Sequence, residues 1–326
     1  MKITVLLLLL SVPFLDQPKL SPEDHARITE VFRLAESVQD SIWSGWSKAP
    51  FALLLVRPDF EFLVRHPHAT NNFDTLGYDQ DFQSLVLYRK RLFAQNLFAT
   101  FPAVNAYPTI VTGQIQNTDA SNSTAWVVTL LHEHFHQLQM AQPNYFAETE
   151  ALGLSRGDKS GMWMLNYPFP YDSSQVNKKF SALCGALANV LSASDAQFRA
   201  KLTSYLDARR AFQLVLLPAD YKYFSFQEWQ EGISRYTEWQ VATFAATHYT
   251  PTAAFQSLKD FKPFAQIADS LESKILTGLP MLSLSKSKRT TFYTIGAAEA
   301  MLLDRVAPRW REQYFTKKFF LEAYYP

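Results

Sequence analysis

The chain has 326 residues, of which 48% are hydrophobic and 19% charged, a composition typical of a globular protein with enough length for a large core. Its 31 basic and 30 acidic residues give a formal net charge of +1, so we expect neither nucleic acid nor anionic lipid as a partner. A single cysteine, Cys184, excludes an intramolecular disulfide, and its apolar neighbours favour a place in the core.

The first 17 residues resemble a secretory signal peptide. Lys2 precedes an apolar run from Ile3 to Leu10 that continues loosely to Leu15 and is too short to span a bilayer comfortably. Ser11 and Pro13 form only a weak pattern for cleavage, so an uncleaved N-terminal anchor is the alternative. We expect a secreted or periplasmic protein with no stable membrane insertion beyond such an anchor.

The segment that follows predicts one helix and then short strands. Ser21 is placed as an N-cap before Pro22 and two acidic residues, so a helix should run to about Ile42. Beyond a turn at residues 43–46, apolar runs bounded by turn formers are typical of strands. We expect these strands at Phe51–Val56, Phe60–Val64, Ser84–Tyr88 and Thr109–Ile115.

An apolar helix should begin near Thr124, with Asn122 or Ser123 as its cap. Apolar residues occupy nearly every face of this helix as far as Leu138, so we expect it to be buried. Beyond Pro143 the sequence indicates mostly helices. They are expected near Tyr145–Leu154, Ser174–Leu191, Ala196–Leu216, Ala219–Thr247 and Thr290–Val306.

The absence of internal repeats and long linkers favours a single α+β unit that is predominantly helical. Its N-terminal α/β half, residues 18–141, would contain a small mixed sheet and the apolar helix, and residues 142–326 would form a helical C-terminal half. A loop at residues 157–172, rich in glycine, proline and aromatic residues, interrupts the helical half. It would either pack over the C-terminal helices or roof a cleft and shape a substrate pocket.

The apolar helix carries the sequence His-Glu-His-Phe-His at residues 132–136, which satisfies the pattern H-E-x-x-H. Residues four apart share one helix face, so His132 and His136 could direct their imidazoles at one metal ion. Glu133 lies one step round the helix and could reach a metal-bound water as a general base. His134 is rotated by about 200° from His132, so we interpret it as a packing residue.

A catalytic zinc site needs a third protein ligand, and two imidazoles with one carboxylate suit Zn²⁺. Residues 229–238 read Trp-Gln-Glu-Gly-Ile-Ser-Arg-Tyr-Thr-Glu. Together with H-E-x-x-H, this stretch resembles the gluzincin metallopeptidases, the aminopeptidase N-like and glycyl aminopeptidase-like enzymes, which carry an E-G-x-x-x-Y-like stretch on a later helix. The resemblance implies a zincin-like fold, with Glu231 as the third zinc ligand and Tyr236 as a catalytic hydrogen-bond donor.

Other acidic residues compete with Glu231 for the role of third ligand. Glu148 and Glu150 lie close in sequence to the histidines, but the chain would have to reverse sharply to return them to the metal. Glu238 lies two turns beyond Glu231. We favour Glu231 because Arg235 and Glu238 follow it along the same helix face, where they could orient the ligands or the substrate.

The sequence thus predicts a zinc-dependent hydrolase, with a peptide or protein as its substrate. Glu133 would take a proton from the attacking water and pass it to the leaving group. The developing oxyanion needs a donor, for which Tyr236 is favoured and Arg235 or Tyr293 are alternatives. A non-catalytic exported protein that holds a peptide or a glycan on a zincin scaffold is the competing hypothesis, and the intact Glu133 favours the enzyme.

Overall fold

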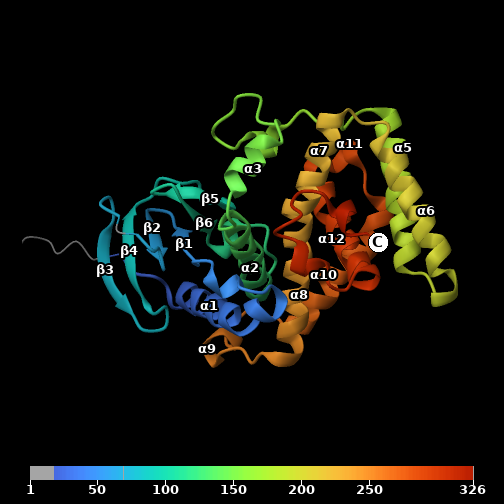
Figure 1. Ribbon diagram of the computed structural model, residues 1–326. Helices are drawn as coiled ribbons and strands as arrows, with labels where there is room; N and C mark the ends of the chain where they lie inside the picture. The colour runs from blue at the N-terminus through green and yellow to red at the C-terminus, as the bar shows by residue number, and fades with distance from the viewer. Residues whose placement is uncertain (1–17, 69, 326) are drawn as a thin grey trace, which may run out of the picture.

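A six-stranded mixed sheet lies at one end of the molecule and a group of helices lies at the other (Figure 1). The computed structural model describes residues 18–68 and 70–325, and the predicted signal peptide lies outside the described residues. The predicted class, α+β with a majority of helix, is confirmed. Within the described part of the chain, no helix combines the length and the apolar character needed to cross a bilayer.

The sheet has the strand order β3-β4-β2-β1-β6-β5. β1 and β6 pair in parallel, whereas the other neighbours pair antiparallel. Strands β3 and β5 were not predicted. β3 is polar and largely exposed and β5 contains Pro102, so neither shows the clear alternation of apolar and polar residues that indicates a strand. The strands are β1 (Leu53–Val56), β2 (Phe60–Val64), β3 (Asp74–Asp79), β4 (Ser84–Lys90), β5 (Phe98–Val104) and β6 (Tyr107–Gly113).

Strand β5 forms one edge of the sheet and contacts helix α2 (Ser123–Met140). The backbone N–H of Gly113 donates to the carbonyl oxygen of Leu97 at 2.9 Å. In an antiparallel ladder every second residue hydrogen-bonds to the neighbouring strand, so the backbone groups of Phe98 and Thr100 face away from β6. This unpaired edge lies beside the helix that carries the H-E-x-x-H motif.

Helices α1 (Pro22–Ile42) and α2 begin at capping residues that the sequence predicts. The hydroxyl of Ser21 accepts a hydrogen bond from the backbone of Asp24 at 3.1 Å, and the Asn122 side chain accepts one from Ala125 at 2.9 Å. In Figure 1, α2 lies between the sheet and α8 (Ile233–His248), and it contacts both. Most of its residues are consequently buried, as predicted.

The C-terminal half is helical, as predicted, but one expected helix is divided and four helices are additional. The helix expected at residues 219–247 is divided into α7 (Pro218–Gln227), a π-helical turn at Glu228–Gly232 and α8. The additional helices are α4 (Trp163–Asn166), α9 (Ala253–Gln256), α10 (Phe264–Gly278) and α11 (Leu284–Ser287). The other predicted helices are α3 (Tyr145–Ala151), α5 (Ser174–Leu191), α6 (Asp195–Gln213) and α12 (Thr291–Val306).

A hydrophobic core extends across both halves of the chain. The ring of Trp43 illustrates this continuity, because its centroid lies 4.9 Å from that of Phe135 and 5.6 Å from that of Trp310. Cys184 is fully buried in the same core, as its apolar neighbours predict. The core therefore fixes α2 relative to the C-terminal helices.

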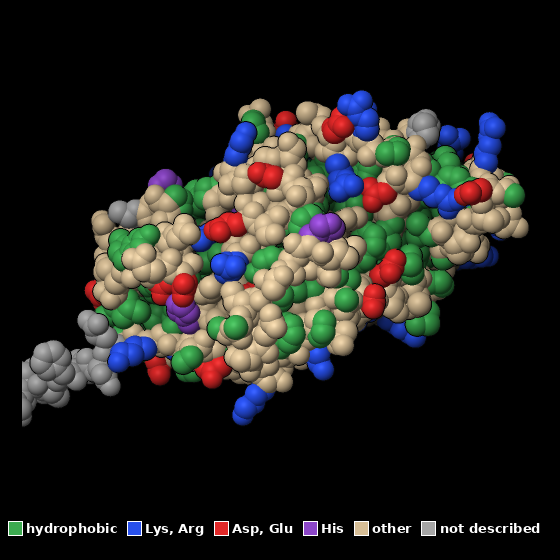
Figure 2. Space-filling model, turned by 90° about the horizontal axis from the view of Figure 1, so that it is seen from below, with side chains coloured by type: hydrophobic (Ala, Val, Ile, Leu, Met, Phe, Trp, Pro, Cys, Tyr) green, Lys and Arg blue, Asp and Glu red, His purple; other side chains and the backbone are tan. Residues whose placement is uncertain are grey.

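Charged side chains of both signs are interspersed on the face of the molecule shown in Figure 2. This distribution agrees with the formal net charge of +1. Neither sign dominates that face.

Candidate metal centre

Three side chains from two parts of the chain converge beside α2. The Oε2 atom of Glu231 lies 3.7 Å from Nε2 of His132 and 3.4 Å from Nε2 of His136. One donor atom from each of the three residues falls within 4.8 Å of the others. Zinc binds imidazole nitrogen and carboxylate oxygen at about 2 Å, so donors at these separations could reach one ion with small adjustments.

The hydrogen bonds of Gln139 orient the His136 imidazole. The amide nitrogen of Gln139 donates to the carbonyl oxygens of Gln230 at 3.1 Å and Trp229 at 3.3 Å, so its amide oxygen faces Nδ1 of His136 at 2.7 Å. Assigned from this network, Nδ1 carries the proton and donates. In the neutral ring the lone pair on Nε2 then points toward Glu231.

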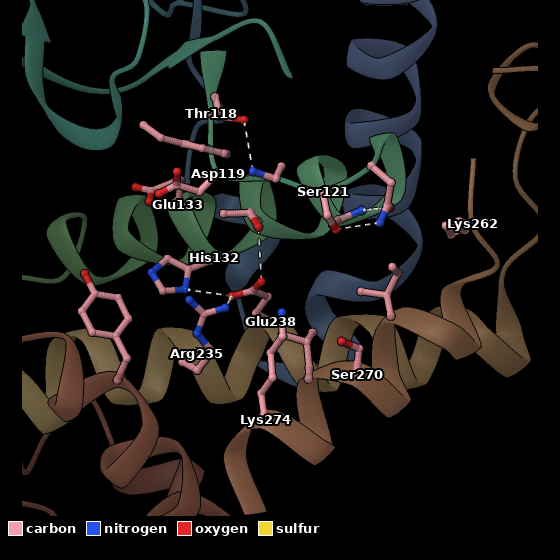
Figure 3. A pocket seen from close by; sticks show the side chains of 18 of the residues that line it. Thr118, Asp119, Ser121, His132, Glu133, Arg235, Glu238, Lys262, Ser270 and Lys274 are labelled. Carbon is pink, nitrogen blue, oxygen red and sulfur yellow. Dashed lines mark hydrogen bonds and ion pairs between the residues drawn. The ribbon is translucent and has the colours of Figure 1, made fainter. Parts of the chain in front are cut away.

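Glu238 plays the corresponding part for His132. Its Oε2 lies 3.4 Å from Nδ1 of His132, an ion-pair distance, and is itself held by Arg235 at 2.5 Å (Figure 3). Burial lowers the pKa of His132, but Glu231 and Glu238 outweigh burial and raise that pKa to about 9. With this pKa the ring carries a proton on both nitrogens at neutral pH, with Nδ1 facing Glu238 and Nε2 facing Glu231, and a cation at Nε2 would displace the proton there.

The donor set fits a divalent cation. Burial raises the pKa of Glu231, but His136, His132 and Arg289 outweigh it and hold this pKa well below its usual value, so the carboxylate is ionised. Two Nε2 lone pairs and an ionised carboxylate oxygen would repel one another unless a proton or a cation lay between them. Zinc is well suited to two imidazoles and one carboxylate with a position left open.

Glu133 lies next to this cluster without joining it. Its carboxylate accepts a hydrogen bond from the hydroxyl of Thr100, on the edge strand β5, at 2.8 Å. Burial raises the pKa of Glu133, while His136 and His132 oppose this shift. A carboxylate with a raised pKa beside a metal site has the properties of a general base.

The structure does not bring Tyr236 to the cluster, which corrects its predicted place. Its buried hydroxyl donates to Asp304 at 2.5 Å and accepts from Gln240 at 2.8 Å. Five residues of helix place Tyr236 roughly 140° round from Glu231, so the two cannot share a face. Tyr293, the alternative donor, lies at the site instead, where its ring stacks on that of His132 with centroids 5.9 Å apart.

Arg289 is a site residue that the sequence analysis missed. Its Nη1 atom donates to Oε1 of Glu231 and to the hydroxyl of Tyr293, each at 3.1 Å. No local pattern identifies this residue, because Arg289 precedes α12 and reaches Glu231 only through helix packing. The contacts orient both the carboxylate and the phenol toward the cluster.

The competing acidic residues are bound elsewhere. Glu148 pairs with Lys318 at 2.5 Å, and Glu150 accepts a hydrogen bond from Ser155 at 2.9 Å. Neither belongs to the group of donors around His132 and His136. Glu238 contacts His132 at Nδ1, on the far side of the ring from Glu231.

His134 packs in the core on the opposite side of α2. Its ring stacks on Phe51 with centroids 3.9 Å apart, and its Nδ1 lies 2.8 Å from the amide oxygen of Gln137. Burial lowers the pKa of His134 to about 3, so the ring is neutral. These contacts agree with its interpretation as a packing residue.

Two cavities meet at the cluster, and Phe98, Glu133 and Tyr293 line both of them. The cavity of about 680 Å³, shown in Figure 3, extends along the N-terminal part of α2 past Arg235 to Lys274 on α10, and we call it the polar cavity. The other, of about 650 Å³, extends past the C-terminal part of α2 to α3 and α4. We call it the apolar pocket because its prominent lining side chains are Met140, Phe146, Met162, Trp163 and Leu165.

The loop at residues 157–172 lines a cavity with its first part and packs on the C-terminal helices with its second. Its first part, residues 158–165, lines the apolar pocket. Its second part packs on the C-terminal helices, with the ring of Tyr167 4.4 Å from Tyr223 and that of Phe169 5.4 Å from Phe292.

A second group of potential ligands lies away from the cleft. Nε2 of His25, on α1, is 2.9 Å from Asp79 and 3.8 Å from Asp81. The ring of His25 also stacks on Phe82. We interpret this partly exposed group as an ion pair that ties α1 to the β3–β4 hairpin.

Comparison of the chain with protein-family models, with curated proteins and with solved structures finds no match. The resemblance to gluzincin metallopeptidases stays a prediction, as does the role of each residue in the cluster.

Proposed function

We propose that the protein is a zinc-dependent hydrolase of peptides with a zincin-like site, in which His132, His136 and Glu231 hold the metal. The observation that carries this proposal is the convergence of the two Nε2 atoms on one oxygen of Glu231, at 3.7 and 3.4 Å. Support also comes from the polar groups behind the imidazoles, Gln139 hydrogen-bonded to Nδ1 of His136 and Glu238 3.4 Å from Nδ1 of His132, which leave both Nε2 atoms facing the same point.

The chemistry follows from the positions of the remaining residues. Bound zinc would supply a Lewis acid for the scissile carbonyl and lower the pKa of a water molecule. Glu133, held by Thr100, takes a proton from the attacking water and delivers it to the leaving amine. Tyr293, oriented by Arg289, donates a hydrogen bond to the oxyanion that develops on the former carbonyl oxygen.

A peptide fits the cleft better than a small molecule. The free edge of β5 offers the backbone groups of Phe98 and Thr100 to an extended chain, which could add to the sheet as a further strand. Cavities on both sides of Glu133 leave room for the chain to continue. Backbone hydrogen bonds would then align the scissile bond beside the cluster.

Metal analysis of purified protein and of the Glu133→Gln variant tests the proposal. We expect about one zinc per chain, removable by a chelator, and retained in Glu133→Gln while the rate of peptide hydrolysis falls by orders of magnitude. His136→Ala should lose both metal and activity. Glu148→Gln is the matched control, because Glu148 pairs with Lys318 and should affect neither.

Protein that takes up no transition metal would overturn the metal centre. Metal-loaded protein that binds peptides or glycans without hydrolysing them would favour the non-catalytic hypothesis. Wild-type turnover by Glu133→Gln would refute the role of Glu133 as general base.

A further inference from the structure

The structure points to internal cleavage of peptides that carry a large apolar side chain on the amino-terminal side of the scissile bond. We infer that the apolar pocket binds this side chain. The inference rests on the proposed function and adds a substrate class and a direction of binding to it.

A cavity lies on each side of the cluster. The polar cavity and the apolar pocket share Phe98, Glu133 and Tyr293, so the general base lies between them. A substrate that pairs with β5 can therefore occupy both cavities at once. An enzyme that removes terminal residues needs a barrier on one side of the reacting bond. The described residues form a cavity of several hundred Å³ on each side.

The apolar pocket exposes three large apolar side chains side by side. Phe146 is 53% exposed, Met162 48% and Leu165 50%. They come from α3, from the loop that precedes α4 and from α4 itself, and they line one cavity with Trp163. Exposed apolar side chains grouped in a concave site are typical of ligand binding.

Hydrogen bonds hold this wall in place. The carboxylate of Asp158 accepts from the backbone of Trp163 at 2.7 Å. Tyr223 and Gln227, on α7, both donate to the carbonyl oxygen of Met164 at 2.8 Å. Since α7 continues into the turn that bears Glu231, the pocket and the metal centre share one support.

The direction of binding follows from β5. Asn96, which precedes β5, lines the polar cavity, and Phe98, the first residue of β5, lines both cavities. Leu97 and the next β5 residues, 99–102, line the apolar pocket, so β5 leads from the shared wall into the apolar pocket. A peptide that adds antiparallel to this edge places its amino-terminal part in the apolar pocket. Its carboxyl-terminal part then enters the polar cavity, past Arg235 and Lys274.

Peptides with both termini blocked test the inference. Zinc-loaded protein should cleave those with Phe, Leu or Met on the amino-terminal side of the bond with a kcat/KM at least tenfold above that for matched peptides with Gly or Asp there. Leu165→Glu and Phe146→Glu should lower the ratio of kcat/KM for the apolar peptides to that for the Gly peptide at least tenfold. Leu217→Glu is the matched control, because Leu217 is 70% exposed outside the cleft and should leave the preference unchanged.

Binding gives a second readout that is independent of turnover. Calorimetry on the Glu133→Gln protein should detect the apolar blocked peptide, and the additional Leu165→Glu change should weaken this binding at least tenfold. Three outcomes would overturn the inference and leave the hydrolase proposal standing. They are cleavage of blocked peptides without an apolar preference, a preference that survives Leu165→Glu, and cleavage only of peptides with a free terminus. If metal-loaded protein cleaves no peptide at all, the proposed function fails and the inference fails with it.

Discussion

The direction in which each imidazole points is decided by residues that do not touch the cluster's centre. Gln139 fixes the proton of His136 because its own amide nitrogen donates to the hydroxyl of Tyr314 and to backbone carbonyl oxygens, which leaves its amide oxygen to accept. Glu238 lies at ion-pair distance, 3.4 Å, from Nδ1 of His132, and Arg235 and Thr129 hold its carboxylate. Such partners fix the tautomer of a ligand and increase its basicity, so they matter nearly as much as the ligands themselves.

Tyr293 and Tyr236 can be distinguished by the same substitution. Tyr293→Phe removes the proposed donor to the oxyanion, so kcat should fall by about 10²-fold or more while zinc content is retained. Tyr236→Phe removes the hydrogen bond to Asp304, so it should lower the free energy of unfolding by about 1 kcal/mol and leave kcat unchanged. Steady-state kinetics and denaturant unfolding on both variants provide the measurement. A loss of kcat in Tyr236→Phe alone would return the role to Tyr236.

At the scale of elements, the π-helical turn at Glu228–Gly232 positions Glu231, the proposed third ligand. The backbones of Gly232 and Gly296, on α12, are in direct contact, and a Cβ added to Gly232 would lie 2.5 Å from Cα of Gly296. This approach brings the first turn of α12, with Tyr293, against Glu231 and His132. A π-helical turn inside a longer helix is a common feature of functional sites.

Gly232→Ala should therefore loosen the metal centre. The added methyl group forces the turn away from α12, and displacement of Glu231 should weaken zinc affinity by about 10- to 100-fold, with a loss of stability as well. Gly185→Ala on α5 is the control, because its Cβ would meet no atom within 4 Å and an alanine there should stabilise the helix by about 0.5–1 kcal/mol. Competition with a zinc chelator and thermal unfolding measure both effects. Wild-type affinity in Gly232→Ala would show that the contact does not position Glu231.

Local patterns predicted the elements whose signals are local. Caps placed the starts of α1 and α2, and the spacing of His132 and His136 placed their rings on one helix face. The π-helical turn has no such signal, since it depends on the packing of Gly232 against Gly296. Arg289 likewise has no local signal, because it reaches Glu231 only through helix packing. The preference for Tyr236 over Tyr293 comes from the resemblance to gluzincins, which carries no information on how α12 packs against the site.

At the scale of the whole molecule, the candidate metal centre depends on how the C-terminal helices are held together. The buried guanidinium of Arg209, on α6, contacts Glu228 at 2.9 Å, Glu299 at 2.7 Å and Glu322 at 3.0 Å. These three carboxylates belong to the π-helical turn, to α12 and to the C-terminal segment. One buried cation thus joins the element that bears Glu231 to the helix that bears Tyr293.

Arg209→Met should destabilise the protein strongly, because it leaves buried carboxylates without their cation, at a cost of about 3–5 kcal/mol. Burial already raises the pKa of Glu228 well above its usual value. A carboxyl group with a raised pKa in the folded state stays neutral in the fold at low pH and lowers the free energy of unfolding as the pH rises. The loss of unfolding free energy in the variant should therefore be larger at pH 8 than at pH 5. Denaturant unfolding at the two pH values measures this difference.

Arg309→Met is the control. Arg309 pairs with Glu312 on the surface, so its substitution should leave the free energy of unfolding unchanged. If Arg209→Met lowers the free energy of unfolding by the same amount at both pH values, the three carboxylates are not the source of that loss.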